Sequence, residues 1–115
     1  MDSILNSIKK ILGIYAEDTS FDIDIIMHIN TVFMILRQMG IGPSNGFSIT
    51  GAYEAWDEYL TDTSLVEPVK TYIALKVRLI FDPPTSSAVT EAINRTISEL
   101  EWRLNVQADY AESFK

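Results

Sequence analysis

The side chains that could perform acid–base or metal chemistry are few and poorly placed in this sequence. His28 is the only histidine and cysteine is absent, so the usual ligand set of a zinc site is missing. Asp22 and Asp24 stand two residues apart, which places them on different sides of a helix, and a role at the positive end of a helix dipole explains them better than a shared carboxylate site. We therefore expect a protein that is not an enzyme and that uses no metal and no cofactor.

The glycine-containing segment in the middle of the chain does not have the pattern of a phosphate-binding loop. Its core, GPSNG at 42–46, contains no lysine and is not followed by the helix that such a loop requires. Nine Lys and Arg residues against sixteen Asp and Glu residues give a net charge of -7, and the basic residues are scattered. Because nonspecific nucleic-acid binding depends on clustered cations, the composition disfavours that role.

Length and composition indicate one small domain that covers residues 1–115. A chain of 115 residues can bury one core, and the absence of cysteine is typical of a protein made in a reducing cytoplasm. The first residues do not form a basic region followed by an apolar block, and no run approaches the roughly 18 apolar residues that cross a membrane. We expect a soluble intracellular protein that does not associate with membranes.

Apolar residues recur at steps of three and four, which predicts an all-α fold, a small bundle of about five helices. The expected helices cover about 2–12, 21–39, 52–60, 64–81 and 87–108. A long irregular loop rich in glycine separates the second helix from the third, and its residues 47–50 could form a short extended stretch. The polar segment 107–115 is expected to be a flexible C-terminal tail that orders on binding.

The third and fourth helices carry the residues expected at the centre of the core. Tyr53, Trp56 and Leu60 should share one side of the third helix, which favours core packing for Trp56. The fourth helix is apolar almost all round, which is typical of the central helix of a bundle. Its two expected stripes contain Val66, Val69, Ile73, Val77 and Ile80 on one side and Tyr72, Leu75 and Leu79 on the other.

A sharp break separates the fourth helix from the fifth. Asp82 precedes Pro83 and Pro84, and a residue before proline is pushed away from helical angles. The hydroxyl residues that follow, at 85–87, can cap the start of the next helix. We interpret Asp82, Pro83 and Pro84 as a structural corner that aims the last helix, without a catalytic role for Asp82.

The last helix has two apolar faces. Its core stripe is expected to contain Val89, Ile93, Ile97, Leu100 and Leu104. Trp102 and Val106 fall on the opposite side, beside Arg95, and a large indole there needs another surface to cover it. Burial against a second subunit and packing on a neighbour within the chain are equally good explanations of Trp102 from the sequence alone. Nearby, Glu99 and Arg103 have the spacing of a helical salt bridge.

Three segments of the chain resemble a known protein family. They are VKTYIALKVRLIFDPP with the following TSSAV (69–89), ISELEWRLN (97–105) and GFSITGAYEAWDEYL (46–60). Together they resemble the small head-tail connector proteins of long-tailed bacteriophages and their prophage relatives, also called head completion or adaptor proteins. The resemblance covers about the C-terminal two thirds of the chain.

The resemblance implies a structural protein that forms a ring of roughly twelve copies beneath the portal protein. Such a ring extends the DNA channel and supports the next neck (stopper) protein or the tail, at the virion neck, after assembly in the cytoplasm of the bacterial host. Passing DNA would not be bound in a sequence-specific way. A ring needs two different patches that meet. The candidate interface residues are Trp102, Val106 and Arg95 on the last helix and Phe47 and Ile49 in the long loop.

Two other classes of function compete with a connector. Another small helical assembly or interaction protein of a phage or prophage would show the same unpaired apolar face. A small helical DNA-binding regulator would need a basic recognition helix, whereas the last helix contains only Arg95 and Arg103 as basic residues.

Overall fold

The computed structural model describes residues 2–112 and is built from helices. In chain order these are α1 (Ile4–Ile11), α2 (Asp22–Gln38), α3 (Trp56–Tyr59), α4 (Val66–Phe81) and α5 (Ser87–Glu112), with a 3-10 turn at Thr63–Leu65 before α4. Within the described residues the only β-type pairing is an isolated bridge between Ser3 and Ala55. The predicted all-α fold of about five helices is confirmed.

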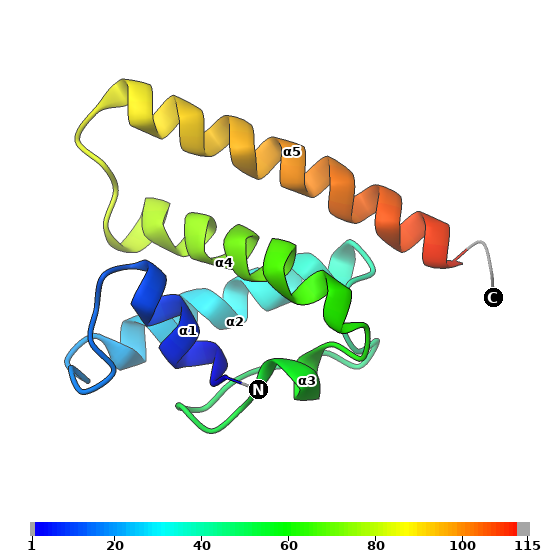
Figure 1. Ribbon diagram of the computed structural model, residues 1–115, viewed down its shortest axis with the longest axis horizontal. Coiled ribbons are helices and arrows are strands. Elements are labelled where there is room, and N and C mark those ends of the chain that lie inside the picture. Colours follow the sequence, from blue (N-terminus) through cyan, green and yellow to red (C-terminus); the bar gives the residue numbers. More distant parts are fainter. Residues whose placement is uncertain (1, 113–115) are drawn as a thin grey trace.

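The central helix of the fold is α4, as its apolar character predicted. It packs against α1, α2 and α5, and it lies between α5 and the rest of the molecule in Figure 1. Val69, Tyr72 and Ile73 are fully buried along it. Ile80, which was expected in the same stripe, is instead 57% exposed, because it lies in the last turn of α4, next to the corner.

A buried lysine fixes the connector between α1 and α2. The Lys9 side chain is 1% exposed, and its Nζ atom lies 2.8 Å from Oδ1 of Asp22. The same ammonium donates hydrogen bonds to the carbonyl oxygens of Ala16 (3.1 Å) and Asp18 (2.7 Å). A buried charge is tolerated only when it is paired and hydrogen-bonded, and these three oxygens meet that condition. The connector, expected only to be a polar link, is therefore held against α1.

The third helix is shorter than predicted. It is the single turn Trp56–Tyr59, because Glu58 accepts a hydrogen bond from the backbone N–H of Ala55 (2.6 Å) and so starts the helix there. Tyr53 lies before this turn and is 88% exposed, so the prediction that it shares an apolar helix face with Trp56 was wrong.

Trp56 lies in the core, as expected. Its side chain is fully buried, and its indole Nε1 donates a hydrogen bond to Oγ of Ser7 (3.0 Å). The bond joins α3 to α1 across a long stretch of sequence. Because the indole N–H is satisfied, the large ring is buried without leaving a polar group unpaired.

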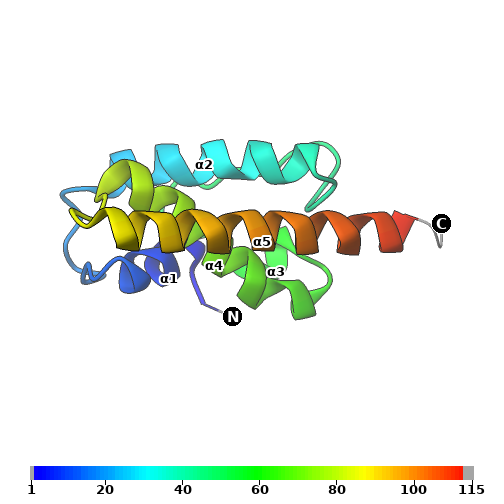
Figure 2. The ribbon, with the colours of Figure 1, turned by 90° about the horizontal axis from the view of Figure 1, so that it is seen from above.

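The last helix is longer than predicted and the molecule is flat. α5 continues to Glu112 instead of ending near 108, so residues 107–112, most of the expected tail, are helical; residues 113–115 lie outside the described residues. The principal extents are 43 × 35 × 20 Å. Figures 1 and 2 show α2 along one broad side, α1 and α3 along the other, and α5 along a narrow edge.

Candidate assembly surfaces

The corner between α4 and α5 sets the direction of the last helix. α4 ends at Phe81, and Asp82 leaves helical angles (φ -146°, ψ 68°) while its N–H still donates to the Arg78 carbonyl oxygen (2.9 Å). Ser86 caps the start of α5, since its Oγ accepts a hydrogen bond from the Val89 N–H (3.4 Å). Pro83 and Pro84 lie between these two ends.

An aromatic contact holds this corner against the start of α2. The rings of Phe21 and Phe81 meet edge to face, with their centroids 5.3 Å apart. Phe21 directly precedes α2, so the end of α4 is held against the start of α2.

The inner face of α5 lies on α4 along most of its length. Ile93, Ile97 and Leu104 are buried, and Leu100 is half-buried. Val89 was also expected in this stripe but is 42% exposed. It lies close to the corner, where α4 and α5 diverge in Figure 1, so α4 does not cover it.

A hydrogen bond between α4 and α5 fixes the rotation of α5 about its own axis. The Tyr72 hydroxyl donates to Oε2 of Glu101 over 2.8 Å. Burial, and then this hydrogen bond to a carboxylate, raises the pKa of Tyr72 well above its ordinary value. With Glu101 directed toward α4, the residues on the far side of the helix must face outward.

The outward face of α5 is apolar at its centre. Trp102 is 65% exposed and Val106 is 48% exposed, with Arg95 exposed two turns before Trp102. The alternative that Trp102 packs on a neighbour within the chain is therefore wrong. Beside it, Arg103 and Glu99 form an exposed ion pair (2.8 Å), which contributes little to stability.

The two loop residues expected at an interface occupy different environments. Phe47 is half-buried and packs on the rings of Phe33 and Tyr59, with centroids 5.4 and 5.1 Å away. Ile49 is 2% exposed, and the side chain of Asn30 holds its backbone in place. The Asn30 Oδ1 atom accepts a hydrogen bond from the Ile49 N–H (2.8 Å), and the Asn30 Nδ2 atom donates one to the Ile49 carbonyl oxygen (3.0 Å). Its side chain belongs to the core of the subunit and is not part of the accessible surface.

A groove lies between the long loop, the segment after α3 and the end of α5. Gly42, Leu65 and Ala108 are among the residues that line it. The hydroxyl of Tyr59 is buried beside this groove and has no hydrogen-bond partner among the described residues. Its burial raises the pKa of Tyr59 well above its ordinary value.

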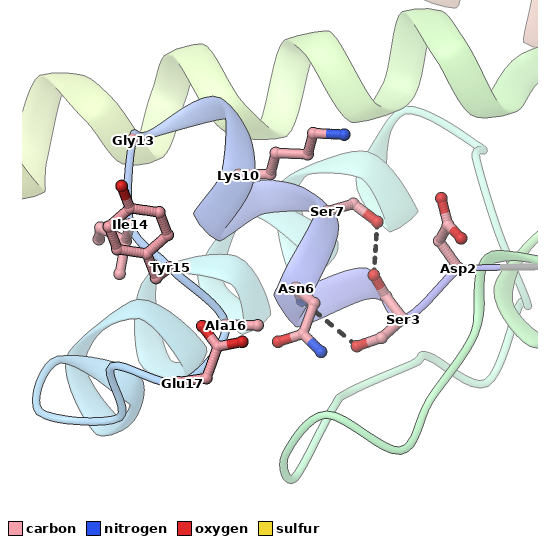
Figure 3. Close-up of a pocket in the computed structure, with 10 residues that line it drawn as sticks. All are labelled: Asp2, Ser3, Asn6, Ser7, Lys10, Gly13, Ile14, Tyr15, Ala16 and Glu17. Carbon is pink, nitrogen blue, oxygen red and sulfur yellow. Dashed lines mark hydrogen bonds between the residues drawn. The ribbon is translucent and has the colours of Figure 1, made fainter.

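Two further features were not foreseen from the sequence. Ile23, Met27 and Met34 are exposed on α2, by 85%, 56% and 54%. On the other broad side, a hollow lies along α1 and the turn after it, where Lys10, Tyr15 and other residues line it (Figure 3). The available signal was the recurrence of Ile23, Met27 and Met34 at steps of four and seven, which indicates a second apolar face on α2.

The described residues do not bring together a cluster of side chains for a metal ion. No group of three or more His, Cys, Asp or Glu side chains comes together in residues 2–112 in a way that could hold a metal ion. His28, the one imidazole, is half-buried on α2. In the same part of the chain, every helix is too short or too polar to cross a membrane.

These features define a small helical structural subunit with apolar surfaces that it does not cover itself. Residues 4–111 match the family model described as phage connector protein, so the chain belongs to that family. No curated protein and no solved structure matches the chain. Membership makes this a structural protein of the phage neck, which associates with other head and tail proteins.

Proposed function

We propose that the chain forms a ring of roughly twelve copies beneath the portal protein, extends the DNA channel and joins the head to the tail. The observation that carries this proposal is the exposed apolar face of α5, with Trp102 65% exposed at its centre. A large uncovered indole on a rigid helix is typical of a surface that binds another protein. The ring would be assembled in the cytoplasm of the bacterial host and would support the next neck (stopper) protein or the tail.

We propose further that Trp102, Val106 and Arg95 form an assembly surface, called here the α5 surface, that contacts a neighbouring subunit of the neck. Val106 lies one turn after Trp102, so the two side chains make one continuous apolar strip. Arg95 has no ion pair among residues 2–112, so its charge is available to a partner. Phe47 belongs to the second candidate patch, in the long loop, whereas Ile49 is omitted because it is buried.

The charge of the chain supports passage of DNA without specific binding. Each copy carries a net charge of -7, and about twelve copies around a channel would place strong negative potential near the lumen. DNA is repelled by such a wall and can move along it. A chain with this charge lacks the clustered cations that hold DNA in place.

Electron microscopy of portal-bearing heads incubated with the purified chain tests the proposal. We expect added density in the form of a ring directly beneath the portal, with a copy number near twelve by quantitative mass analysis. Heads that lack portal serve as the control and should bind none. Absence of the chain from portal-bearing heads, or its binding to the shell instead, would contradict the proposal. Light scattering of the isolated chain measures its mass in solution and so shows whether the ring forms without the portal as a template.

A further inference from the structure

The outer face of α2 carries an apolar stripe made by Ile23, Met27 and Met34, called here the α2 stripe. The three residues are four and seven positions apart, so they lie in one row along the helix. They point away from the core, because the buried residues of α2, such as Ile29 and Phe33, occupy the other side. Two of the three are methionines, whose flexible side chains adapt to the shape of a partner.

The opposite broad side of the molecule carries the hollow along α1, called here the α1 hollow. Tyr15 in this region is 81% exposed, and Ile11 nearby is 53% exposed. Figure 3 shows Lys10, Tyr15 and Glu17 among the residues around the hollow. Figure 2 places α1 and α2 on opposite sides of the molecule, across its shortest dimension of 20 Å.

Charges around the two surfaces are complementary. Asp24 is exposed beside the first half of the α2 stripe, and Arg37 is exposed near its end. The α1 hollow offers the opposite signs, with Lys10 on one part of its wall and Glu17 on another. None of these four side chains forms an ion pair within residues 2–112. Each surface therefore offers charges that the other can pair, Asp24 with Lys10 and Arg37 with Glu17.

We propose that the α2 stripe of one copy packs into the α1 hollow of the next copy, with Asp24 facing Lys10. This inference rests on the proposed ring and names its subunit contact. Two different patches on opposite broad sides make a head-to-tail contact, and repeating it closes a ring when the rotation between copies divides a full turn. The α5 surface then remains along a narrow edge of each subunit, where it is accessible to the portal protein.

A two-fold dimer through α2 alone is the competing arrangement. It would also cover the α2 stripe, and antiparallel α2 helices would bring Asp24 near Arg37 of the other copy. It would leave the exposed Tyr15 and Ile11 uncovered on the other side. The head-to-tail contact covers both sides, which is why we favour it.

Engineered cysteines distinguish the two arrangements directly, since the chain has no cysteine of its own. Portal-bearing heads are loaded with the Tyr15→Cys/Met27→Cys double variant, treated with a short thiol-reactive cross-linker and analysed on a denaturing gel. We expect a ladder of cross-linked multimers from the double variant, and only monomers from either single variant. The control pair Met27→Cys/Val89→Cys should give no ladder.

Other results would overturn the proposal in distinguishable ways. Dimers from Met27→Cys alone would establish the two-fold contact through α2. No cross-linking while the chain is present as a ring would show that other surfaces join the copies, and the proposed function would stand. Absence of the wild-type chain from the heads would instead refute the proposed function itself.

Charge reversal provides a second test that does not depend on cross-linking geometry. Asp24→Lys should reduce the number of copies per head at least fivefold, and the added change Lys10→Asp should restore most of it. Asp57→Lys, the same change in the first turn of α3, should leave the copy number unchanged. Equal binding by Asp24→Lys and the wild type, or no recovery in the double variant, would contradict the proposed facing of Asp24 and Lys10.

Discussion

The body formed by α1–α4 and the helix α5 differ in how many sides hold them. In the body, Trp56 is fully buried and hydrogen-bonded to Ser7, and polar clamps from Lys9 and Asn30 tie the loops to the helices. α5 is held mainly on one side, by α4, and its other side exposes Trp102. The exposed side of a helix that is fixed on one side can bind a partner, and changes to it have little effect on the stability of the fold. Replacing the tryptophan of the body, Trp56, should therefore reduce stability, whereas replacing the tryptophan of α5, Trp102, should reduce assembly.

Trp56→Ala should cause the largest loss of stability. It removes a fully buried indole from the centre of the body, and such truncations cost about 3–5 kcal/mol. Urea unfolding followed by circular dichroism measures the change in the free energy of unfolding. A loss below about 1 kcal/mol would mean that the body is not the rigid part of the molecule.

Lys9→Met should be the next most damaging change. The variant keeps the length of the side chain but leaves the carbonyls of Ala16 and Asp18 and the carboxylate of Asp22 without their shared donor. Because Asp22 is partly exposed, we expect a loss of about 2–4 kcal/mol, toward the lower end of the range for broken buried ion pairs. Lys10→Met, at the exposed neighbour, is the control and should change stability by less than about 0.5 kcal/mol. Equal effects of the two variants would show that Lys9 does not hold the connector.

Tyr72→Phe sharpens the comparison at the boundary between the body and α5. It removes only the hydroxyl that donates to Glu101, a bond to a charged group, so we expect a loss of about 1–2 kcal/mol by urea unfolding. Tyr59→Phe is the matched control, because its buried hydroxyl has no partner to lose among the described residues. Its expected change is near zero. A larger loss of stability from Tyr59→Phe than from Tyr72→Phe would contradict this comparison, because it would mean that the Tyr59 hydroxyl makes a stabilising hydrogen bond.

The helices α2 and α4 and the corner after α4 were predictable from the sequence, because they depend on local signals. Apolar spacing gave α2 and α4 to within a few residues, and the double proline marked the end of α4 at Phe81. The family resemblance, based on the same segments, agrees with the family match over residues 4–111.

What the sequence did not reveal depends on contacts between distant segments. Lys9 is buried only because the connector folds back over it, and Ile49 is buried only because Asn30 binds its backbone. The end of α5 was missed because Gln107 and Ala108 lie beside the long loop, a contact that polar composition does not indicate. Helical periodicity shows that α2 has two apolar faces, but it does not say which face the fold leaves uncovered.

Trp102→Ala should have the smallest effect on the fold. Its indole is 65% exposed, so the free energy of unfolding should change by less than about 0.5 kcal/mol and the helical circular dichroism should be unchanged. A global loss of stability comparable to that of Trp56→Ala would place Trp102 in the core and would remove the contrast between the two regions.

The most direct test of the contrast is the number of copies bound per portal-bearing head for Trp102→Ala, measured beside the matched control Val89→Ala. Both residues are exposed apolar side chains on α5, but Val89 lies outside the α5 surface, near the corner. We predict that Trp102→Ala binds at least tenfold more weakly than the wild type while remaining folded, and that Val89→Ala binds normally. Normal binding by a folded Trp102→Ala variant would contradict the role of α5 as an assembly surface.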